Sequence, residues 1–576
     1  MEISANAYKV LKSRYLLKGP DGVIIETALQ LFKRVASHIA KAEIEFGGVS
    51  DAQKWEQKFF DILSELKFLP NSPTLMNAGT SSGQLSACFV LPVEDTIDGI
   101  FTSLKNAALI HQSGGGTGFN FSSLRPRGDF ISANSGFSSG PISFMKIFDA
   151  ATGNIKQGGK RRGANMGIIN IDHPDIEEFI QVKRKESELK NFNISVGMLD
   201  SFMQALENNE DWELKHPSTR KIIKKIKAKD LWNLIVENAW ASGDPGLIFL
   251  DTIESKNPTP SLGSIVCTNP CGEVPMLSYE ACNLGSIDIS KFFVKETNEI
   301  NWDELANSIA IAIRFLDNVV EINDYILPEI RSVVSGNRKI GLGIMGWADL
   351  LMLKEIPYAS EQAIVLAKQV MKFISEKSEK ASAELASERG VFKNWEKSIY
   401  YPDRPLRNAT RTSIAPTGTI SIIAHASSSI EPIFALANCR KNVLDNETLS
   451  EINSIFVNYL KKKNLYTDKL MEHVLIHGTI ANTDLTDEVK KLFRTALEIE
   501  PFWHLKHQLA FQEFTDNAVS KTINLPQNAT LTDVNDAYMM AWKEKAKGIT
   551  VFRNGSKGEQ VLHQGIQQNS CKVCKD

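Results

Sequence analysis

The first 70 residues carry hydrophobic side chains at a helical spacing. In residues 29–35 and 55–63, apolar positions recur at i, i+3, i+4 and i+7, which places them on one face of an α-helix. Residues 71–79 interrupt this pattern with asparagine, proline and glycine. We therefore predict a helical N-terminal region over residues 1–85, with a turn-forming segment near its C-terminal end.

Short apolar runs alternate with helical stretches through most of the remaining chain. Runs typical of buried strands occur at 87–91, 166–171 and 264–267, and a long helical stretch at 361–389 is followed by Gly390, a residue that often ends helices. This alternation favours an α/β domain with a mostly parallel sheet or barrel, which we assign to residues 86–553. Residues 554–576 are polar and rich in glycine, glutamine and lysine, so we predict a flexible tail.

The composition indicates the compartment and the general class of the protein, and it says little about a specific function. Hydrophobic residues make up 43% of the chain and charged residues 23%, as in ordinary globular proteins. A net charge of −3 gives no general attraction to nucleic acid or to membranes. The N-terminus lacks a secretion pattern, and the seven cysteines suit a reducing compartment better than a disulfide scaffold. We expect a cytoplasmic protein with no membrane contact and no direct nucleic-acid contact.

One cysteine lies in a segment with the chemistry of a catalytic thiol. Cys271 stands between Pro270 and Gly272, which favour an exposed turn, and Asn269 and Glu273 flank that turn. An amide can orient a substrate, and a carboxylate can act as a general base. The segment therefore predicts a reactive thiol with polar groups on both sides.

The other cysteines suggest either redox chemistry or simple burial. Cys571 and Cys574 form a Cys-x-x-Cys pair near the chain end; a zinc half-site and a mobile redox dithiol are both open, and the dithiol is favoured. Cys267 and Cys439 are expected to be small buried hydrophobic residues. The histidines show no zinc-ligand spacing, so we predict no metal site built from protein ligands.

Three glycine-containing segments are candidates for binding phosphate. Segments 113–118 and 153–161 depart from the spacing of nucleotide-binding loops, and tight turns are the simpler interpretation. Segment 415–421 combines small residues and hydroxyls just before an apolar stretch. It suits a diphosphate at the start of a helix, with an ordinary loop as the alternative.

Several motifs together resemble those of ribonucleotide reductase catalytic subunits, most closely the adenosylcobalamin-dependent class II type. The motifs run nearly end to end, at 71–79, 84–92, 157–166, 268–273, 279–286, 415–419 and 515–526. The resemblance implies a ten-stranded α/β barrel, made of two antiparallel halves of five parallel strands each. It also implies a central finger loop that carries Cys271, and no N-terminal ATP-cone.

The resemblance implies radical chemistry at the finger loop. Cys271 would carry a thiyl radical that abstracts the 3′ hydrogen of the ribose. Glu273 would deprotonate the 3′ hydroxyl, and Asn269 would orient the sugar. The product would be a 2′-deoxyribonucleotide for DNA synthesis.

Reducing equivalents would come from four further cysteines. Cys88 and Cys282 resemble the pair that reduces the substrate and ends as a disulfide. Cys571 and Cys574 would reduce that disulfide and would in turn be reduced by a thioredoxin-like protein.

The resemblance also implies the binding residues. A loop at 158–166 would relay effector identity, and a (d)NTP specificity effector would be held by Asp95, Thr96 and Arg125 at the interface of a homodimer. Contacts to a ribonucleoside diphosphate are implied for Ser72, Ala87, Cys88, Gly116, Asn269, Pro270, Cys271, Gly272, Glu273, Pro416, Thr417, Gly418, Thr419 and Ile420.

The predicted class depends on residues that the sequence lacks. Class I enzymes receive the radical from a second subunit through two adjacent tyrosines near the C-terminus, and segment 548–553 contains none. Tyr400 and Tyr401 fall elsewhere and are expected to be a packing pair. The resemblance thus implies a vitamin B12-dependent ribonucleoside-diphosphate reductase that uses adenosylcobalamin. The alternatives are a class I-type subunit with an unusual radical route, a triphosphate reductase, and a regulatory paralogue, against which the intact catalytic set argues.

Overall fold

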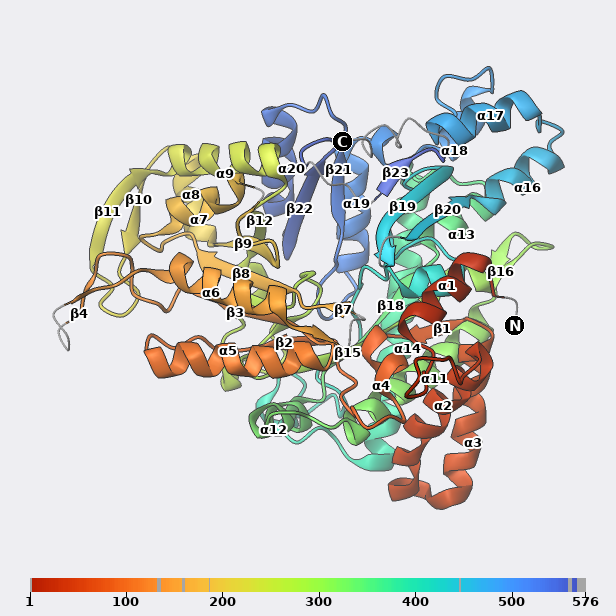
Figure 1. Cartoon of the computed structure of the whole chain (residues 1–576), viewed down its shortest axis with the longest axis horizontal. Coiled ribbons are helices and arrows are strands. Elements are labelled where there is room, and N and C mark those ends of the chain that lie inside the picture. Colours follow the sequence, from red (N-terminus) through yellow and green to blue (C-terminus); the bar gives the residue numbers. More distant parts are fainter. Residues whose placement is uncertain are drawn as a thin grey trace.

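Two sets of parallel strands form the centre of the protein (Figure 1). The computed structural model describes residues 3–131, 136–157, 161–185, 187–444, 447–557 and 562–566. Residues 158–160 and both tail cysteines, Cys571 and Cys574, lie outside the described residues.

The first half of the barrel comes from consecutive strands of the chain. All four pairings within it are parallel. Its strands, in spatial order, are β2 (Cys88–Val90), β3 (Gly116–Asn120), β8 (Asn165–Asn170), β9 (Phe192–Met198) and β12 (Gly246–Phe249).

The second half is assembled from more distant segments. β15 (Ala281–Asp288) pairs in parallel with β18 (Ile340–Met345). Single parallel bridges then join Leu342 to Thr412 and Ile414 to Val519. β21 (Thr522–Leu525) continues from the last of these segments and pairs in parallel with β22 (Gly548–Arg553).

The two halves meet in antiparallel pairs at both edges. β2 pairs with β15, and β12 pairs with β22, each in antiparallel register. Within the described residues, these contacts close a ring of ten strand positions, five in each half. The predicted barrel of two antiparallel halves is therefore confirmed. The short β1 (Phe68–Pro70) pairs antiparallel with β15 and lies outside the ring.

The N-terminal region is helical, as predicted, and packs against one side of the barrel. Thr27 caps α2 and forms a capping box with Gln30. Glu43, which is fully buried, accepts hydrogen bonds from Arg314 of α11 (Trp302–Ile322) and Arg389 of α14 (Glu361–Arg389). These ion pairs tie the region to the barrel's outer helices. Its helices are α1 (Ala5–Arg14), α2 (Ala28–Ala40), α3 (Ile44–Ser64) and α4 (Ser72–Asn77).

Helix α4 corrects one part of the sequence interpretation. Residues 71–79 were expected to form turns, but Asn71 accepts a hydrogen bond from the backbone N–H of Thr74 and so caps a helix. Pro73 lies in the first turn of that helix, where proline lacks no needed hydrogen bond. Asparagine and proline are common both in turns and at helix N-termini, so the sequence pattern did not distinguish a turn from the start of a short helix.

Helices surround the barrel, and smaller sheets lie around it (Figure 1). α14 begins and ends where the sequence predicted, with Gly390 directly after it. The outer helices include α5 (Ile97–Gln112), α6 (Pro141–Asn154), α9 (Ala228–Ser242), α11 (Trp302–Ile322), α12 (Pro328–Asn337), α13 (Trp347–Leu353), α14 (Glu361–Arg389), α19 (Pro501–Gln512) and α20 (Leu531–Lys543). Near the C-terminus stand α16 (Ser454–Lys462), α17 (Asp468–His477), α18 (Asp487–Leu492) and a sheet of β19 (Ala437–Leu444), β20 (Glu447–Ile452) and β23 (Leu562–Gln564).

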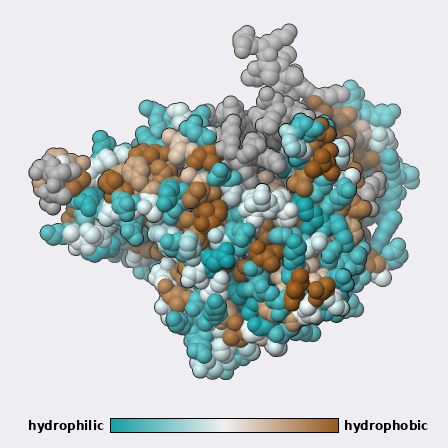
Figure 2. All heavy atoms as spheres, turned by 60° about the horizontal axis from the view of Figure 1, so that its bottom comes forward, coloured by the Kyte–Doolittle hydropathy of each residue, from teal (hydrophilic) through white to brown (hydrophobic). Residues whose placement is uncertain are grey.

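The surface is mixed in character. The face turned forward in Figure 2 is mostly hydrophilic, with separate hydrophobic patches. Across the described part of the chain, no helix combines the length and apolar character that a membrane span needs.

Candidate active site

A hairpin that carries Cys271 lies against the inner wall of the barrel. Its strands are β13 (Cys267–Thr268) and β14 (Pro275–Met276). The carbonyl oxygen of Thr268 comes so close to Gly118 of β3 that a Cβ at Gly118 would lie 1.8 Å from it. At Gly116 a Cβ would lie 2.9 Å from Pro270. Two glycines in β3 therefore make room for the hairpin.

Both halves of the barrel hold this hairpin in place. Asn193 of β9 donates from Nδ2 to the carbonyl of Pro270 at 2.8 Å. From the other half, the hydroxyl of Ser413 and the backbone N–H of Ala518 donate to the carbonyl of Glu273, each at 2.9 Å. The predicted finger loop is therefore anchored between the two halves.

Asn269 shapes the tip of the loop and contacts a second cysteine. Its Oδ1 accepts from the backbone N–H of Val274 at 3.0 Å, and its carbonyl accepts from Gly272 at 3.1 Å. Gly272 has φ of 81°, a conformation that favours glycine. The Nδ2 of Asn269 lies 3.1 Å from the sulfur of Cys88. Cys271, at the tip, is exposed.

Cys88 and Cys282 lie directly opposite each other where the halves join. They are paired residues in the antiparallel register of β2 and β15, and both are buried thiols. Directly opposed residues in such pairs have Cα atoms roughly 4.5–5.5 Å apart, within the range of a disulfide. Burial raises the pKa of Cys282, with Lys339 acting in the opposite direction, so the resting form is the thiol.

A cavity of about 310 Å³ gathers the predicted substrate residues. Asn269, Cys271 and Glu273 all line it, together with the loop that precedes α15 (Ile420–Ala424). Gly272 is the one predicted contact that does not; it lines a cavity on the other side of the loop. The other predicted contacts that line this cavity are Ser72, Ala87, Cys88, Gly116, Pro270, Pro416, Thr417, Gly418, Thr419 and Ile420.

The N-terminal helices contribute residues to this cavity that the sequence interpretation missed. Arg14 and Tyr15 come from the end of α1, and Asn71 caps α4. Tyr15 and Ser72 share a hydrogen bond between their hydroxyls of 2.7 Å. The Nδ2 of Asn71 is buried and has no acceptor among the described residues, as expected of a group that awaits a ligand. Helix periodicity alone cannot show that α1 reaches the barrel mouth.

A second cavity of about 600 Å³ lies on the other side of Cys271. Pro270, Cys271 and Pro416 line both cavities. The other walls of the second cavity include the strands β12, β21 and β22. The finger loop therefore separates two spaces, and its thiol faces both.

The second cavity offers hydrogen-bonding groups that part of a large polar cofactor could contact. The Oε1 of Gln508 is buried there and has no donor among the described residues, although its Nε2 donates to the carbonyl of Gly548. Ser520 and Thr522 add hydroxyls. Lys547 also lines this cavity and donates to the carbonyls of Asp516 and Asn517, while burial lowers its pKa to about 8. Amide-rich cofactors such as cobalamin offer donors and acceptors that fit this lining.

Among the described residues, no tyrosine lines this cavity. Segment 548–553, which lacks tyrosine, is β22 and forms part of the cavity wall. Tyr400 is buried and donates to the carbonyl of Ala409, whereas Tyr401 is exposed and packs against Trp395 at 5.0 Å between ring centroids. Both tyrosines make local packing contacts, as predicted.

The predicted effector residues lie together outside both cavities. Arg125 contacts Asp95 at 2.8 Å between Nε and Oδ2, and Thr96 caps α5. In the described part of the predicted relay loop, Ala164 lines the substrate cavity and Met166 the second one. The loop thus contacts the site whose specificity it is predicted to control.

The remaining candidate residues have structural surroundings. Cys267 and Cys439 are buried, as predicted. His504 and His507 are also fully buried, and hydrogen bonds join them to the carbonyls of Ala496 and Tyr358. No group of three His, Cys, Asp or Glu residues that could hold a metal occurs in the described residues.

Comparisons with known families match nearly the whole chain. Residues 1–83 match the family described as "Ribonucleotide reductase, all-alpha domain". Residues 86–403 and 401–552 match "Ribonucleotide reductase, barrel domain".

Individual relatives agree with these matches. The chain is 48% identical to the vitamin B12-dependent ribonucleoside-diphosphate reductase of Thermoplasma acidophilum, over 99% of this chain and 81% of that one. It is 45% identical to the enzyme of the same name from Mycobacterium tuberculosis, over 98% of this chain and 81% of that one. Among solved structures, it is similar to the Actinobacillus ureae class Id ribonucleotide reductase alpha subunit, with a TM-score of 0.78, 25% identity, and coverage of 96% and 97%.

Proposed function

Because the chain belongs to the ribonucleotide reductase family, we propose that it is a vitamin B12-dependent ribonucleoside-diphosphate reductase. The relatives at 45–48% identity carry that name. One observation supports the proposal most directly: Cys271 faces two cavities, and Asn269 and Glu273 line the smaller one with it. A thiol in this position can be oxidised from one side and act on a substrate on the other.

In the proposed reaction, the ribose lies in the 310 Å³ cavity with its 3′ carbon at Cys271. The thiyl radical of Cys271 takes the 3′ hydrogen atom and becomes a thiol. Glu273 accepts the proton of the 3′ hydroxyl, and Asn269 donates a hydrogen bond to the sugar. The negative charge that develops on the 3′ oxygen promotes loss of the 2′ hydroxyl.

Cys88 and Cys282 complete the proposed reaction. One of them donates a proton to the departing 2′ hydroxyl, which leaves as water. The pair then transfers one hydrogen atom to the 2′ carbon and one further electron to the sugar, and Glu273 returns its proton to the 3′ oxygen. Their opposed positions in β2 and β15 allow them to end as a disulfide. Cys271 returns its hydrogen to the 3′ carbon and becomes a radical again.

Adenosylcobalamin, when bound, supplies the radical that oxidises Cys271. We propose that the 600 Å³ cavity would receive the part of it that lies next to Cys271, with Gln508, Ser520 and Thr522 as hydrogen-bonding residues. The finger loop keeps this space apart from the substrate and excludes water between them.

An assay with each of the four ribonucleotides tests the proposed function. Purified chain with dithiothreitol should form deoxyribonucleotides only when adenosylcobalamin is added, and diphosphates should be reduced faster than triphosphates. Activity that requires an added metal-containing subunit would instead support the class I alternative. Preference for triphosphates would overturn the assigned substrate alone.

The tail cysteines are proposed to pass electrons to Cys88 and Cys282. Cys571→Ser or Cys574→Ser should stop turnover with a thioredoxin-like reductant and preserve it with dithiothreitol, because a small dithiol reaches the buried disulfide directly. Cys439→Ser, a cysteine away from the site, is the control. Equal loss with both reductants would argue for a structural pair.

A homodimer with effector sites is proposed from an exposed apolar stripe. Ile97, Phe101 and Leu109 are exposed along α5, and Ile147 is exposed on the neighbouring α6. Such a stripe is typical of subunit interfaces. Thr96, which caps α5, places the proposed effector residues beside it. Phe101→Glu should yield monomers in sedimentation and abolish the response to (d)NTP effectors, and an unchanged mass would contradict the interface.

A further inference from the structure

A further cavity lies away from both sites discussed above. It has a volume of about 1050 Å³, is open to solvent, and is lined by α12, the stem of the finger hairpin and the loop after α14. It shares no lining residue with either cavity at Cys271. Volumes of this size accommodate nucleotide-sized ligands.

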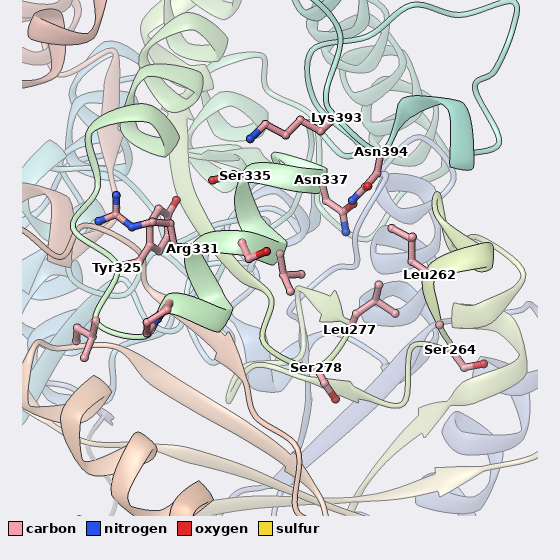
Figure 3. A pocket seen from close by; sticks show the side chains of 16 residues that line it. Leu262, Ser264, Leu277, Ser278, Tyr325, Arg331, Ser335, Asn337, Lys393 and Asn394 are labelled. Atoms are coloured by element: carbon pink, nitrogen blue, oxygen red, sulfur yellow. The ribbon is translucent and has the colours of Figure 1, made fainter.

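The lining is cationic and rich in neutral hydrogen-bonding groups. Of the sixteen lining residues, Arg331 and Lys393 are charged and none is a carboxylate. Figure 3 shows their charged ends and the hydroxyl of Ser335 on the same side of the cavity. Asp324, outside the lining, is 4.0 Å from Arg331, and both side chains are largely exposed, at 79% and 60%. Two cations with serine hydroxyls and amides suit phosphate oxygens better than apolar or cationic ligands.

A chain of hydrogen bonds leads from this cavity to the catalytic elements. The Nδ2 of Asn394 donates to Oδ1 of Asn337 at 2.8 Å, and the Nδ2 of Asn337 donates to Oε1 of Glu280 at 2.6 Å. The Oε2 of Glu280 accepts from the backbone N–H of Leu277 at 2.7 Å. Leu277 directly follows β14 of the finger hairpin, and Glu280 is two residues before Cys282.

We infer that this cavity binds a phosphate-bearing small molecule, and that binding alters the stem of the finger hairpin through Asn337 and Glu280. The phosphates would lie between Arg331 and Lys393. Asn394 and Asn337 line the cavity themselves, so an occupant contacts the first two members of the hydrogen-bond chain. The site would be regulatory, because the substrate and the cysteines lie in other cavities.

Chemical modification of Lys393 tests the binding directly. The full chain would be treated with an amine-acylating reagent at increasing pyrophosphate or ATP, and modification would be followed by mass spectrometry. Both ligands should slow acylation of Lys393 about tenfold at saturation, while adenosine should not. Lys397, exposed nearby but outside the lining, serves as the internal control. Unchanged acylation of Lys393, or equal protection by adenosine, would overturn the inference.

Substitution of Arg331 tests whether pyrophosphate protects Lys393 by binding in this cavity or by binding at the active site. Arg331→Gln should raise the pyrophosphate concentration needed for protection about tenfold. Arg494→Gln, a half-buried arginine that pairs with Glu500 away from this cavity, should leave it unchanged. Protection that persists in Arg331→Gln would show that pyrophosphate acts from another site.

Hydrogen exchange tests the proposed coupling. Pyrophosphate should slow exchange of the Leu277 backbone amide in the unmodified chain and not in Arg331→Gln. An unaltered rate at Leu277 while Lys393 is protected would overturn the coupling and leave only the binding.

Discussion

The two halves of the barrel bury polar groups in different ways. In the first half, His111, Thr117 and Asn165 are buried and joined by neutral hydrogen bonds of 2.8 and 2.7 Å. In the second half, the polar groups behind the strands are ionic. Asp317, fully buried, contacts Arg338 at 2.8 Å and Arg389 at 3.3 Å.

This difference follows from how far apart the segments are in the chain. First-half strands follow one another, so short contacts suffice to align them. The second half brings together segments near residues 43, 317, 338, 389 and 407 through one ion network. Buried charges are costly unless each is paired, so such a network allows few alternative arrangements. The first half holds a buried ion pair too, between Lys183 and Asp244 at 3.1 Å, but only in the second half does a network of buried charges join several distant segments.

The largest expected effect falls where the two halves meet, at the finger loop. Cys271→Ala should abolish turnover with every reductant, because no other described thiol faces both cavities. Folding and nucleotide binding should persist, as measured by circular dichroism and equilibrium binding. Cys439→Ala, in β19 outside the barrel, should remain active. Residual turnover in Cys271→Ala would remove the basis of the proposed mechanism.

The next largest effect is expected from breaking the buried ion network of the second half. Asp317→Asn removes the negative charge that faces Arg338, Arg389 and Arg407, and should lower the free energy of unfolding by about 3–5 kcal/mol in urea titrations. Glu384→Gln breaks an exposed pair with Lys380 and should cost less than about 0.5 kcal/mol. A similar decrease in the free energy of unfolding in both variants would show that the buried network contributes no more than an exposed ion pair.

The stability of the first half, where the buried hydrogen bonds are neutral, should depend on pH. Burial lowers the pKa of His111 from 6.5 to about 4, so between these values the unfolded chain binds a proton that the folded chain does not. Stability should therefore fall as the pH drops from 6.5 to 4, by roughly 2–4 kcal/mol. His111→Gln should flatten this dependence in thermal unfolding curves. An equally steep dependence in the variant would assign it to other groups.

Asp317 should respond in a lower pH range. Although burial opposes the shift, Arg338, Arg407 and Arg389 lower its pKa below the usual 3.8. Its contribution to stability is therefore present above pH 3.8 and is lost as the pH falls through the shifted pKa. On acidification, the loss of stability caused by buried His111 should therefore begin at a higher pH than the loss caused by Asp317.

The smallest effect concerns the substrate cavity. Arg14, at the end of α1, lines it together with the loop at Pro416–Ile420. Arg14→Met should raise the KM for a diphosphate about tenfold, the worth of one charge-assisted hydrogen bond, and should leave the dependence on adenosylcobalamin unchanged. Lys12→Met, two residues earlier on α1, exposed and outside the cavity lining, is the matched control. A change in the cofactor dependence would show that the two cavities are not independent.

Much of this arrangement could be predicted from the sequence because local signals carried it. Pro270 and Gly272 indicated the exposed turn around Cys271, and the alternating runs indicated an α/β fold. The sequence could not show that Arg14 and Asn71 line the cavity, since their placement depends on packing across hundreds of residues. The bounds of 85 and 553 for the barrel, and the roles of the tail cysteines, stay predictions.

Gly118 determines how closely the finger loop can approach β3. A single methyl group there would meet the carbonyl of Thr268 at 1.8 Å and push the hairpin, with Cys271, toward the middle of the barrel. Hydrogen-atom transfer needs reacting atoms in near contact, so a displacement of an ångström would be felt in the rate. The absence of a Cβ at Gly118 thus lets the hairpin pack closely against β3, and this close packing fixes the position of Cys271 in the barrel.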